Sequence, residues 1–271
     1  MDGPAAAAVH RSPAAGAAGV GTVSWGFVVP WLLATGRVAG FLLALPALGG
    51  PRVPAAASAG LSLFVAASAP LESVGGLEAS SFAALLLKEL AVGLFLGWGV
   101  ALAFVAVQVG GQVAELTLGL GSGQLVDPVH GHESTVLARL WSTLALVAYF
   151  ATDTHHQALR LLGLSFDRLR PDQLPSLVPF VEAGFELFAA SFLAGVQVAA
   201  PFVAASMAVE TALALGARAA PQVNVFLVSL PLKVGLALVL VGAFLPHTLG
   251  GVTAIWDRTL AGVGAVLRRW P

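Results

Sequence analysis

The spacing between charged residues constrains this chain more than any other feature of its sequence. Five long runs contain no Asp, Glu, Lys or Arg: residues 12–36, 53–71, 90–114, 187–209 and 234–256. A helix that crosses a bilayer needs about 20 mainly apolar residues, and about 17–25 is the usual range. The last four runs fit this window, and the spanning part of the first run begins near Trp25. The sequence therefore predicts a membrane protein.

Composition excludes several classes of protein. Of the 271 residues, 58% are hydrophobic and only 10% are charged, whereas a soluble domain is about half apolar and about a quarter charged. So few charges cannot coat a globule of this size, which excludes an ordinary soluble enzyme and a nucleic-acid binder with a basic face. The chain has no cysteine, so disulfides, thiolate metal sites and cysteine nucleophiles are excluded as well.

We expect an all-α polytopic integral membrane protein with about six hydrophobic helices. The predicted spans are residues 25–48, 53–70, 83–107, 135–152, 180–213 and 222–245. We expect a flexible N-terminal tail over 1–24, a membrane domain over 25–246 and a C-terminal tail over 247–271. The stretch that follows Asp153 is expected to be a loop, because it contains Pro171, Pro175 and Pro179. The fifth span could tilt, protrude or break at Pro201, and Pro231 interrupts the sixth.

Residues 108–134 are moderately apolar but too rich in glycine to predict a helix. Irregular backbone at membrane depth is tolerated only where protein buries it or where it lines a cavity. Residues 108–128 are therefore expected to form either a re-entrant, plug-like loop or a plain connector outside the membrane. The candidate plug residues are Gly110, Gly111, Gln112, Leu116, Gly119, Leu120, Gly121 and Gly123.

Two cations lie inside predicted spans, Arg37 near the centre of the first and Lys233 in the last. A charge at such a depth costs roughly 2.5–3.5 kcal/mol on insertion scales. Each cation must therefore pair, face water or contact another subunit. Glu210 lies near a span end and could pair with either one.

Small residues recur at the spacing that lets helices approach closely in membranes. The motifs are Gly36-x-x-x-Gly40, Gly93-x-x-x-Gly97 and Gly119-x-x-x-Gly123. They predict tightly packed helices, either within the chain or between this chain and its neighbours.

Two groups of potential metal ligands occur near predicted span ends. They are His130, His132 and Glu133, and then Asp153, His155 and His156. A zinc site needs three or four converging ligands, and the HExxH pattern of zinc hydrolases is missing from the sequence. We therefore interpret these residues as polar side chains at the membrane interface, and we expect no metal, no cofactor and no catalytic residue.

Three stretches together resemble a known family. The first contains Gly111-Gln112, Gly119-Leu120-Gly121 and Asp127-Pro128. The second is Asp153-Thr154-His155-His156, and the third runs from Arg218 through Pro221, Gln222, Asn224 and Phe226 to Pro231-Leu232-Lys233. Their order and spacing resemble the FliR/SctT family of flagellar and injectisome export-gate membrane proteins, from about Trp31 to Pro246.

The chain departs from that family at a few positions. Thr154 stands where the family usually has glycine, and Ser229-Leu230 leans towards the injectisome branch. Val126-Asp127-Pro128 and Ser165-Phe166 lean towards the flagellar branch, which we favour.

The resemblance implies a non-enzymatic subunit of the type III protein-export gate, in the bacterial inner membrane at the basal body of a flagellum or injectisome. Its implied partners are FliP-like, FliQ-like and FlhB-like subunits, membrane lipid and unfolded export substrates, with no nucleic acid. In such gates the helices wind into a cone that is partly lifted out of the bilayer, so the planar count of six spans would fail there.

The resemblance also assigns roles to residues. The family's glycine-rich plug matches residues 108–128 of this chain. Separately from the resemblance, we predict a structural or assembly role for Arg37, Asp127, Pro128, Arg218, Pro221, Gln222, Asn224, Phe226, Pro231 and Lys233. The alternatives to a flagellar gate subunit are an injectisome counterpart, a small-solute permease and an intramembrane hydrolase.

Overall fold

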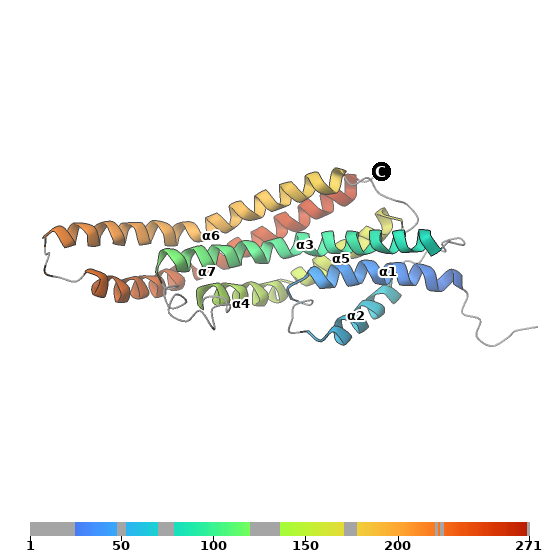
Figure 1. The fold of residues 1–271 in the computed structure, drawn as a ribbon, viewed down its shortest axis with the longest axis horizontal. Coiled ribbons are helices and arrows are strands. Elements are labelled where there is room, and N and C mark those ends of the chain that lie inside the picture. The colour runs from blue at the N-terminus through green and yellow to red at the C-terminus, as the bar shows by residue number, and fades with distance from the viewer. Residues whose placement is uncertain are drawn as a thin grey trace, which may run out of the picture.

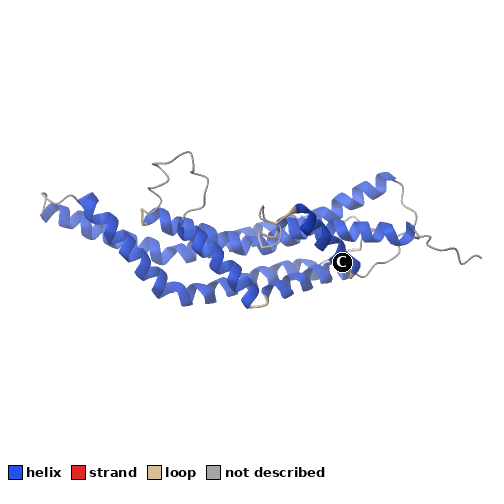
Figure 2. Cartoon of the chain, turned by 90° about the horizontal axis from the view of Figure 1, so that it is seen from below, coloured by secondary structure: helices blue, strands red, loops and turns tan. Residues whose placement is uncertain are grey.

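The structure, a computed structural model, describes residues 25–47, 53–69, 79–119, 136–170, 178–219, 222 and 225–269. All regular secondary structure in this part of the chain is helical (Figure 2). The helices are α1 (Trp25–Ala44), α2 (Ala55–Ala67), α3 (Ala79–Thr117), α4 (Val136–Ala151), α5 (Thr154–Arg168), α6 (Val178–Ala219) and α7 (Val225–Arg269). The predicted all-α fold class is confirmed.

The helices form an elongated bundle along one axis (Figure 1). α3 lies along the middle and packs against α1, α4, α6 and α7, while α2 packs on α1. α6 and α7 form a long antiparallel pair that extends beyond the other helices at one end (Figure 1). The core consists mainly of apolar side chains, and a few charged side chains are buried within it.

An aromatic cluster joins three of these helices. The ring of Phe104 in α3 lies 5.2 Å from that of Tyr149 in α4 and 5.1 Å from that of Trp256 in α7. Both contacts have tilted, edge-to-face geometry, which aromatic quadrupoles favour. Tyr149 and Trp256 are themselves 5.5 Å apart between ring centroids, so the cluster fixes the spacing of α3, α4 and α7.

Three helices are much longer than a bilayer requires. α3, α6 and α7 contain 39, 42 and 45 residues, which correspond to about 59, 63 and 68 Å at the rise of an α-helix. The hydrocarbon core of a bilayer is only about 30 Å thick. By length and composition, two of the described helices, α3 and α6, are able to cross a membrane, and four apolar helical segments are shorter. The chain is an all-α polytopic membrane protein whose long helices do not fit six short, planar spans.

Several predicted boundaries are wrong. α3 continues to Thr117, so residues 108–117 are helix rather than an irregular loop. The predicted loop after Asp153 contains helix α5. α7 passes through Pro231 without interruption and continues past residue 246, where we expected a tail to begin. For the fifth span, which could tilt, protrude or break at Pro201, the structure shows a continuous helix through Pro201. The expected tail over 1–24 lies outside the described residues.

Two of these errors share one physical cause, which is that packing overrides local preference. The C-terminal part of α3 tolerates Gly110 because its backbone lies against α6 there. The last part of α7 is helical because Ile255, Trp256 and Val263 are buried in the core. α5 was missed because it is amphipathic rather than apolar, although its buried residues follow a helical spacing: Thr154, Ala158, Leu162 and Ser165.

Candidate functional site

α1 and α3 approach each other very closely where they cross, because glycines on both helices leave room for the backbones. A Cβ atom added to Gly93 would collide with the Arg37 carbonyl, and one added to Gly97 would collide with the Phe41 carbonyl. Gly40 of α1 lies equally close to the backbone of α3. Two of the predicted small-residue motifs therefore pack against each other within the chain.

Arg37 lies beside this crossing and is fully buried, as is its partner Glu89 of α3, with both side chains 0% exposed. The pair is bidentate: Arg37 Nε donates to Glu89 Oε2 at 2.5 Å, and Arg37 Nη2 donates to Glu89 Oε1 at 2.9 Å. Parallel bonds of this kind are short, strong and geometrically specific. The first of the three options for Arg37, pairing, is the one that the structure adopts.

The same guanidinium holds the end of α5. Arg37 Nη1 donates to the Ser165 carbonyl at 2.7 Å, and Nη2 donates to the Leu169 carbonyl at 2.8 Å. The guanidinium carbon also lies 4.4 Å from the centre of the Phe166 ring. The Ser165 carbonyl already accepts from the Leu169 N–H at 2.9 Å, so Arg37 adds a second donor there. The carbonyl end of a helix carries partial negative charge, so a buried cation stabilises this end of α5.

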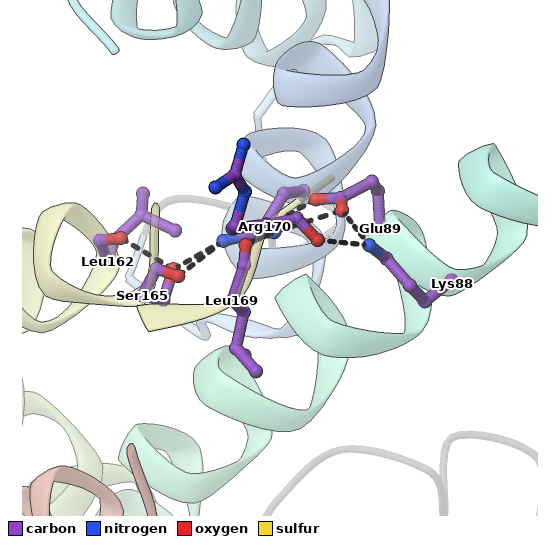
Figure 3. Close-up of polar contacts among 7 residues, drawn as sticks. Lys88, Glu89, Leu162, Ser165, Leu169 and Arg170 are labelled. Atoms are coloured by element: carbon purple, nitrogen blue, oxygen red, sulfur yellow. Dashed lines mark hydrogen bonds and ion pairs between the residues drawn. The ribbon is translucent and has the colours of Figure 1, made fainter. Parts of the chain in front are cut away.

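Lys88 completes the arrangement (Figure 3). Its Nζ atom lies 2.7 Å from Glu89 Oε1 and donates to the Arg170 carbonyl at 2.9 Å. We call Arg37, Lys88, Glu89 and the carbonyls that they bind the α1–α3–α5 cluster. It contains two cations and one carboxylate, and the excess positive charge faces the carbonyl end of α5. Such a cluster holds three helices in one register.

Glu89 was not predicted as the partner of Arg37, although the sequence contains a signal for it. Glu89 lies one helical turn before Gly93, and Arg37 directly follows Gly36. In the structure α1 and α3 run in parallel, with Gly40 packed against Leu90 and Leu94, and this register brings the two charges together.

Lys233 of α7 forms a separate ion pair with Glu210 of α6, with 2.7 Å between Nζ and Oε1. The Lys233 side chain is 16% exposed, whereas that of Glu210 is 56% exposed. Glu210 is thus the partner of Lys233 and not of Arg37. Gly119 lies next to Lys233: a Cβ atom added to Gly119 would be 3.9 Å from Lys233 Nζ.

The end of α3 therefore lies between α6 and α7. Ser206 Oγ of α6 donates to the Thr117 carbonyl at 2.6 Å, which satisfies an acceptor at the end of α3. Gly119 then adopts a left-handed backbone with φ of 72°, a conformation that commonly terminates helices and that glycine accepts without strain.

The predicted plug residues do not form one loop. Gly110 and Gly111 are buried within α3, and a Cβ atom on Gly110 would lie 2.7 Å from Val198 Cβ in α6. Gln112 is half-buried and Leu116 is 68% exposed. Leu120, Gly121 and Gly123 lie outside the described residues.

The predicted assembly motif is only partly described. Arg218 is exposed in the last turn of α6, Gln222 is exposed between α6 and α7, and Pro231 is exposed on α7. Phe226 lies in the first turn of α7. Asp127, Pro128, Pro221 and Asn224 lie outside the described residues. Arg37 belongs to the α1–α3–α5 cluster and not to this end of the bundle.

α6 presents a broad uncovered apolar face. In the most apolar 18-residue stretch of α6, only 33% of the residues are buried inside the chain, whereas 67% are buried in the corresponding stretch of α3. The exposed side chains include Val181, Phe185, Phe188, Phe192 and Val196. A large contiguous apolar surface marks a site of contact with lipid or with another protein.

Comparison with known proteins agrees with this architecture. The chain is 31% identical to the flagellar biosynthetic protein FliR of Bacillus subtilis over 221 residues, which cover 78% of this chain and 83% of that protein. It is 29% identical to the FliR of Escherichia coli over 231 residues, covering 83% and 86% of the two chains.

A more distant relative is the Yop proteins translocation protein T of Yersinia pestis, which is 26% identical over 168 residues, covering 59% of this chain and 63% of that protein. Residues 28–259, nearly all of the helical bundle, match the family described as bacterial export proteins, family 1. The chain belongs to this family of bacterial export proteins.

Proposed function

We propose that this protein is a non-enzymatic subunit of a flagellar type III protein-export gate, located in the bacterial inner membrane at the base of the flagellum. In this role it forms part of the portal through which unfolded substrates leave the cytoplasm. Membership of the export family supports the proposal. The flagellar relatives are more similar to the chain and cover more of it than the Yersinia protein does.

The observation that carries the proposal is the uncovered apolar face of α6, on a helix twice as long as a bilayer span requires. Exposed large apolar side chains occur on this helix from Val178 to Leu215, and a hydrocarbon layer about 30 Å thick covers only about half of that length. FliP-like, FliQ-like and FlhB-like subunits are the proposed cover for the remainder.

We assign the closing element of the portal to the end of α3. Val105, Val109, Val113 and Leu116 follow a helical spacing and are all exposed, so they form one apolar stripe. Apolar constrictions close pores by excluding water. Residues 119–123 follow this stripe in the sequence, and we include them in the closing element.

The injectisome counterpart is the second candidate, favoured by the similarity to the Yersinia translocation protein and by Ser229-Leu230. A small-solute permease is disfavoured by the two buried or half-buried cations. The hydrogen bonds of Arg37 go to Glu89 and to the carbonyls of α5, and Lys233 pairs with Glu210. Cations that are already paired do not offer a site for a solute.

Deletion of the gene in its own organism tests the proposal. We expect loss of secreted hook and filament proteins and loss of swimming, with both restored by the wild-type gene on a plasmid. Normal flagellar secretion combined with loss of injectisome secretion would favour the second candidate. If neither kind of secretion changes, the export role is refuted.

A further inference from the structure

The corner between α4 and α5 gathers three potential metal ligands that lie outside the α1–α3–α5 cluster. Asp153 precedes the first residue of α5 and has a left-handed backbone, with φ of 55° and ψ of 19°. Asp and Asn adopt this conformation more readily than most other residues. The turn directs the Asp153 carboxylate back towards the start of α5, where its Oδ1 atom lies 3.1 Å from Nδ1 of His156.

His155 and His156 lie together at this turn. One ligand atom from each of Asp153, His155 and His156 lies within 4.8 Å of the other two. The two imidazole rings are 4.0 Å apart between centroids. Ligand atoms in a tetrahedral zinc site are about 3.3 Å apart, given the usual bond lengths. Movements of about 1 Å by the exposed Asp153 and His156 side chains would bring the three donors to coordinating distance.

His155 supplies an independent observation. Its Nδ1 atom is buried and has no hydrogen-bond partner among the described residues. A buried polar atom without a partner is costly, and native proteins rarely leave one unexplained. Coordination by a bound ion would account for it.

We propose that Asp153, His155 and His156 bind a divalent transition-metal ion of the zinc type, with water completing the coordination. Two imidazole nitrogens and one carboxylate oxygen match the ligands that zinc prefers in proteins with an open position. The ion joins the turn to the first helical turn of α5. Because Arg37 holds the other end of α5, α5 would then be fixed at both ends. The sequence alone favoured plain interfacial residues, and the convergence of the three side chains changes that interpretation.

Metal binding by the purified full-length chain tests the proposal. The protein should carry no polyhistidine tag, and it should be stripped with a chelator in detergent. Zn²⁺ affinity is then measured by competition with a chromogenic chelator, and Co²⁺ is used as a spectroscopic probe. We expect one Zn²⁺ per chain and a Co²⁺ visible spectrum of low coordination number.

Variants locate the site. Asp153→Asn removes the carboxylate but keeps a side chain that tolerates the left-handed backbone, so the metal-free chain should keep its melting temperature. We expect this variant to lower Zn²⁺ affinity at least about tenfold, and we expect His155→Gln/His156→Gln to abolish stoichiometric binding. The matched control, His130→Gln/His132→Gln, should bind as the wild type does.

The proposal is overturned if the wild-type chain fails to bind one Zn²⁺, or if binding is lost in the control variant instead. It is also overturned if Asp153→Asn binds as tightly as the wild type. If the double histidine variant does not fold, Asp153→Asn alone decides the question.

Discussion

Replacing Arg37 by Met should strongly destabilise the protein. The substitution removes both hydrogen bonds to the Glu89 carboxylate. It also removes the donors to the Ser165 and Leu169 carbonyls. Methionine fills similar space, so the effect comes from the lost charge and hydrogen bonds rather than from a cavity.

The magnitude follows from burial. Removing one partner of a buried ion pair costs about 3–5 kcal/mol, since the remaining charge is left in a poorly solvated site. The Leu169 carbonyl would lose its Arg37 donor, which would add about 1–3 kcal/mol, whereas the Ser165 carbonyl still accepts from the Leu169 N–H. Lys88 stays within 2.7 Å of Glu89 and offsets part of the loss. We therefore expect a loss of about 3 kcal/mol in the free energy of unfolding, or a factor on the order of 100 in the folding equilibrium.

Reversible unfolding in mixed detergent micelles measures this change. Tryptophan fluorescence reports the transition, because Trp141 and Trp256 are almost fully buried. Arg168→Met is the matched control: Arg168 lies on α5 but is exposed, so its loss should change stability by less than about 0.5 kcal/mol.

A double-mutant cycle tests the reasoning itself. Arg37→Met/Glu89→Gln removes both charges of the pair, so it should be less destabilised than the sum of its single variants by at least about 1 kcal/mol. A cost below about 1 kcal/mol for Arg37→Met, or a coupling energy near zero, would refute the idea that the α1–α3–α5 cluster holds the helices together.

Three further predictions concern helix packing and export. Gly93→Ala should lower the free energy of unfolding by about 1–3 kcal/mol or more, because the added Cβ would strike the α1 backbone. The control Gly60→Ala should be neutral or slightly stabilising, because no atom lies within 4 Å of the added Cβ. Equal effects of the two substitutions would contradict the packing argument. Lys233→Leu leaves Glu210 without its cation and should reduce secretion of export substrates more than Arg168→Leu does; near-wild-type secretion from both would count against a role for the pair. Deletion of residues 119–123 should leave an assembled gate that leaks small ions in conductance measurements, and an assembled deletion variant as tight as the wild type would show that this segment is only a connector.

The sequence by itself determined the fold class and indicated which segments could pack closely. Long uncharged runs leave the backbone no partner but itself in an apolar medium, so an all-helical membrane protein was predictable. The glycine motifs of α1 and α3 were predictable as close contacts, because only small side chains let two helix backbones approach so closely. That Arg37 and Lys233 need partners followed from the cost of burying a charge.

Only the tertiary structure decided which partners these residues have and where the helices end. Glu89 and Glu210 are far in sequence from the cations that they bind. The register of the packed helices determines that Arg37 pairs with Glu89 and that Lys233 pairs with Glu210. α3 continues through its glycines, and α7 continues past residue 246, because apolar burial against neighbouring helices outweighs weak local helix propensity.

The candidate metal site illustrates the same limit. The identities of Asp153, His155 and His156 are plain in the sequence, yet residues two and three apart along a chain need not converge. The left-handed turn at Asp153 brings their ligand atoms together. That backbone conformation depends on how the two flanking helices pack. α4 packs on α3 and α7, whereas α5 packs on α7 and is bound by Arg37. The sequence specifies which potential ligands are present, but the packing of helices that are distant in sequence determines whether their ligand atoms converge.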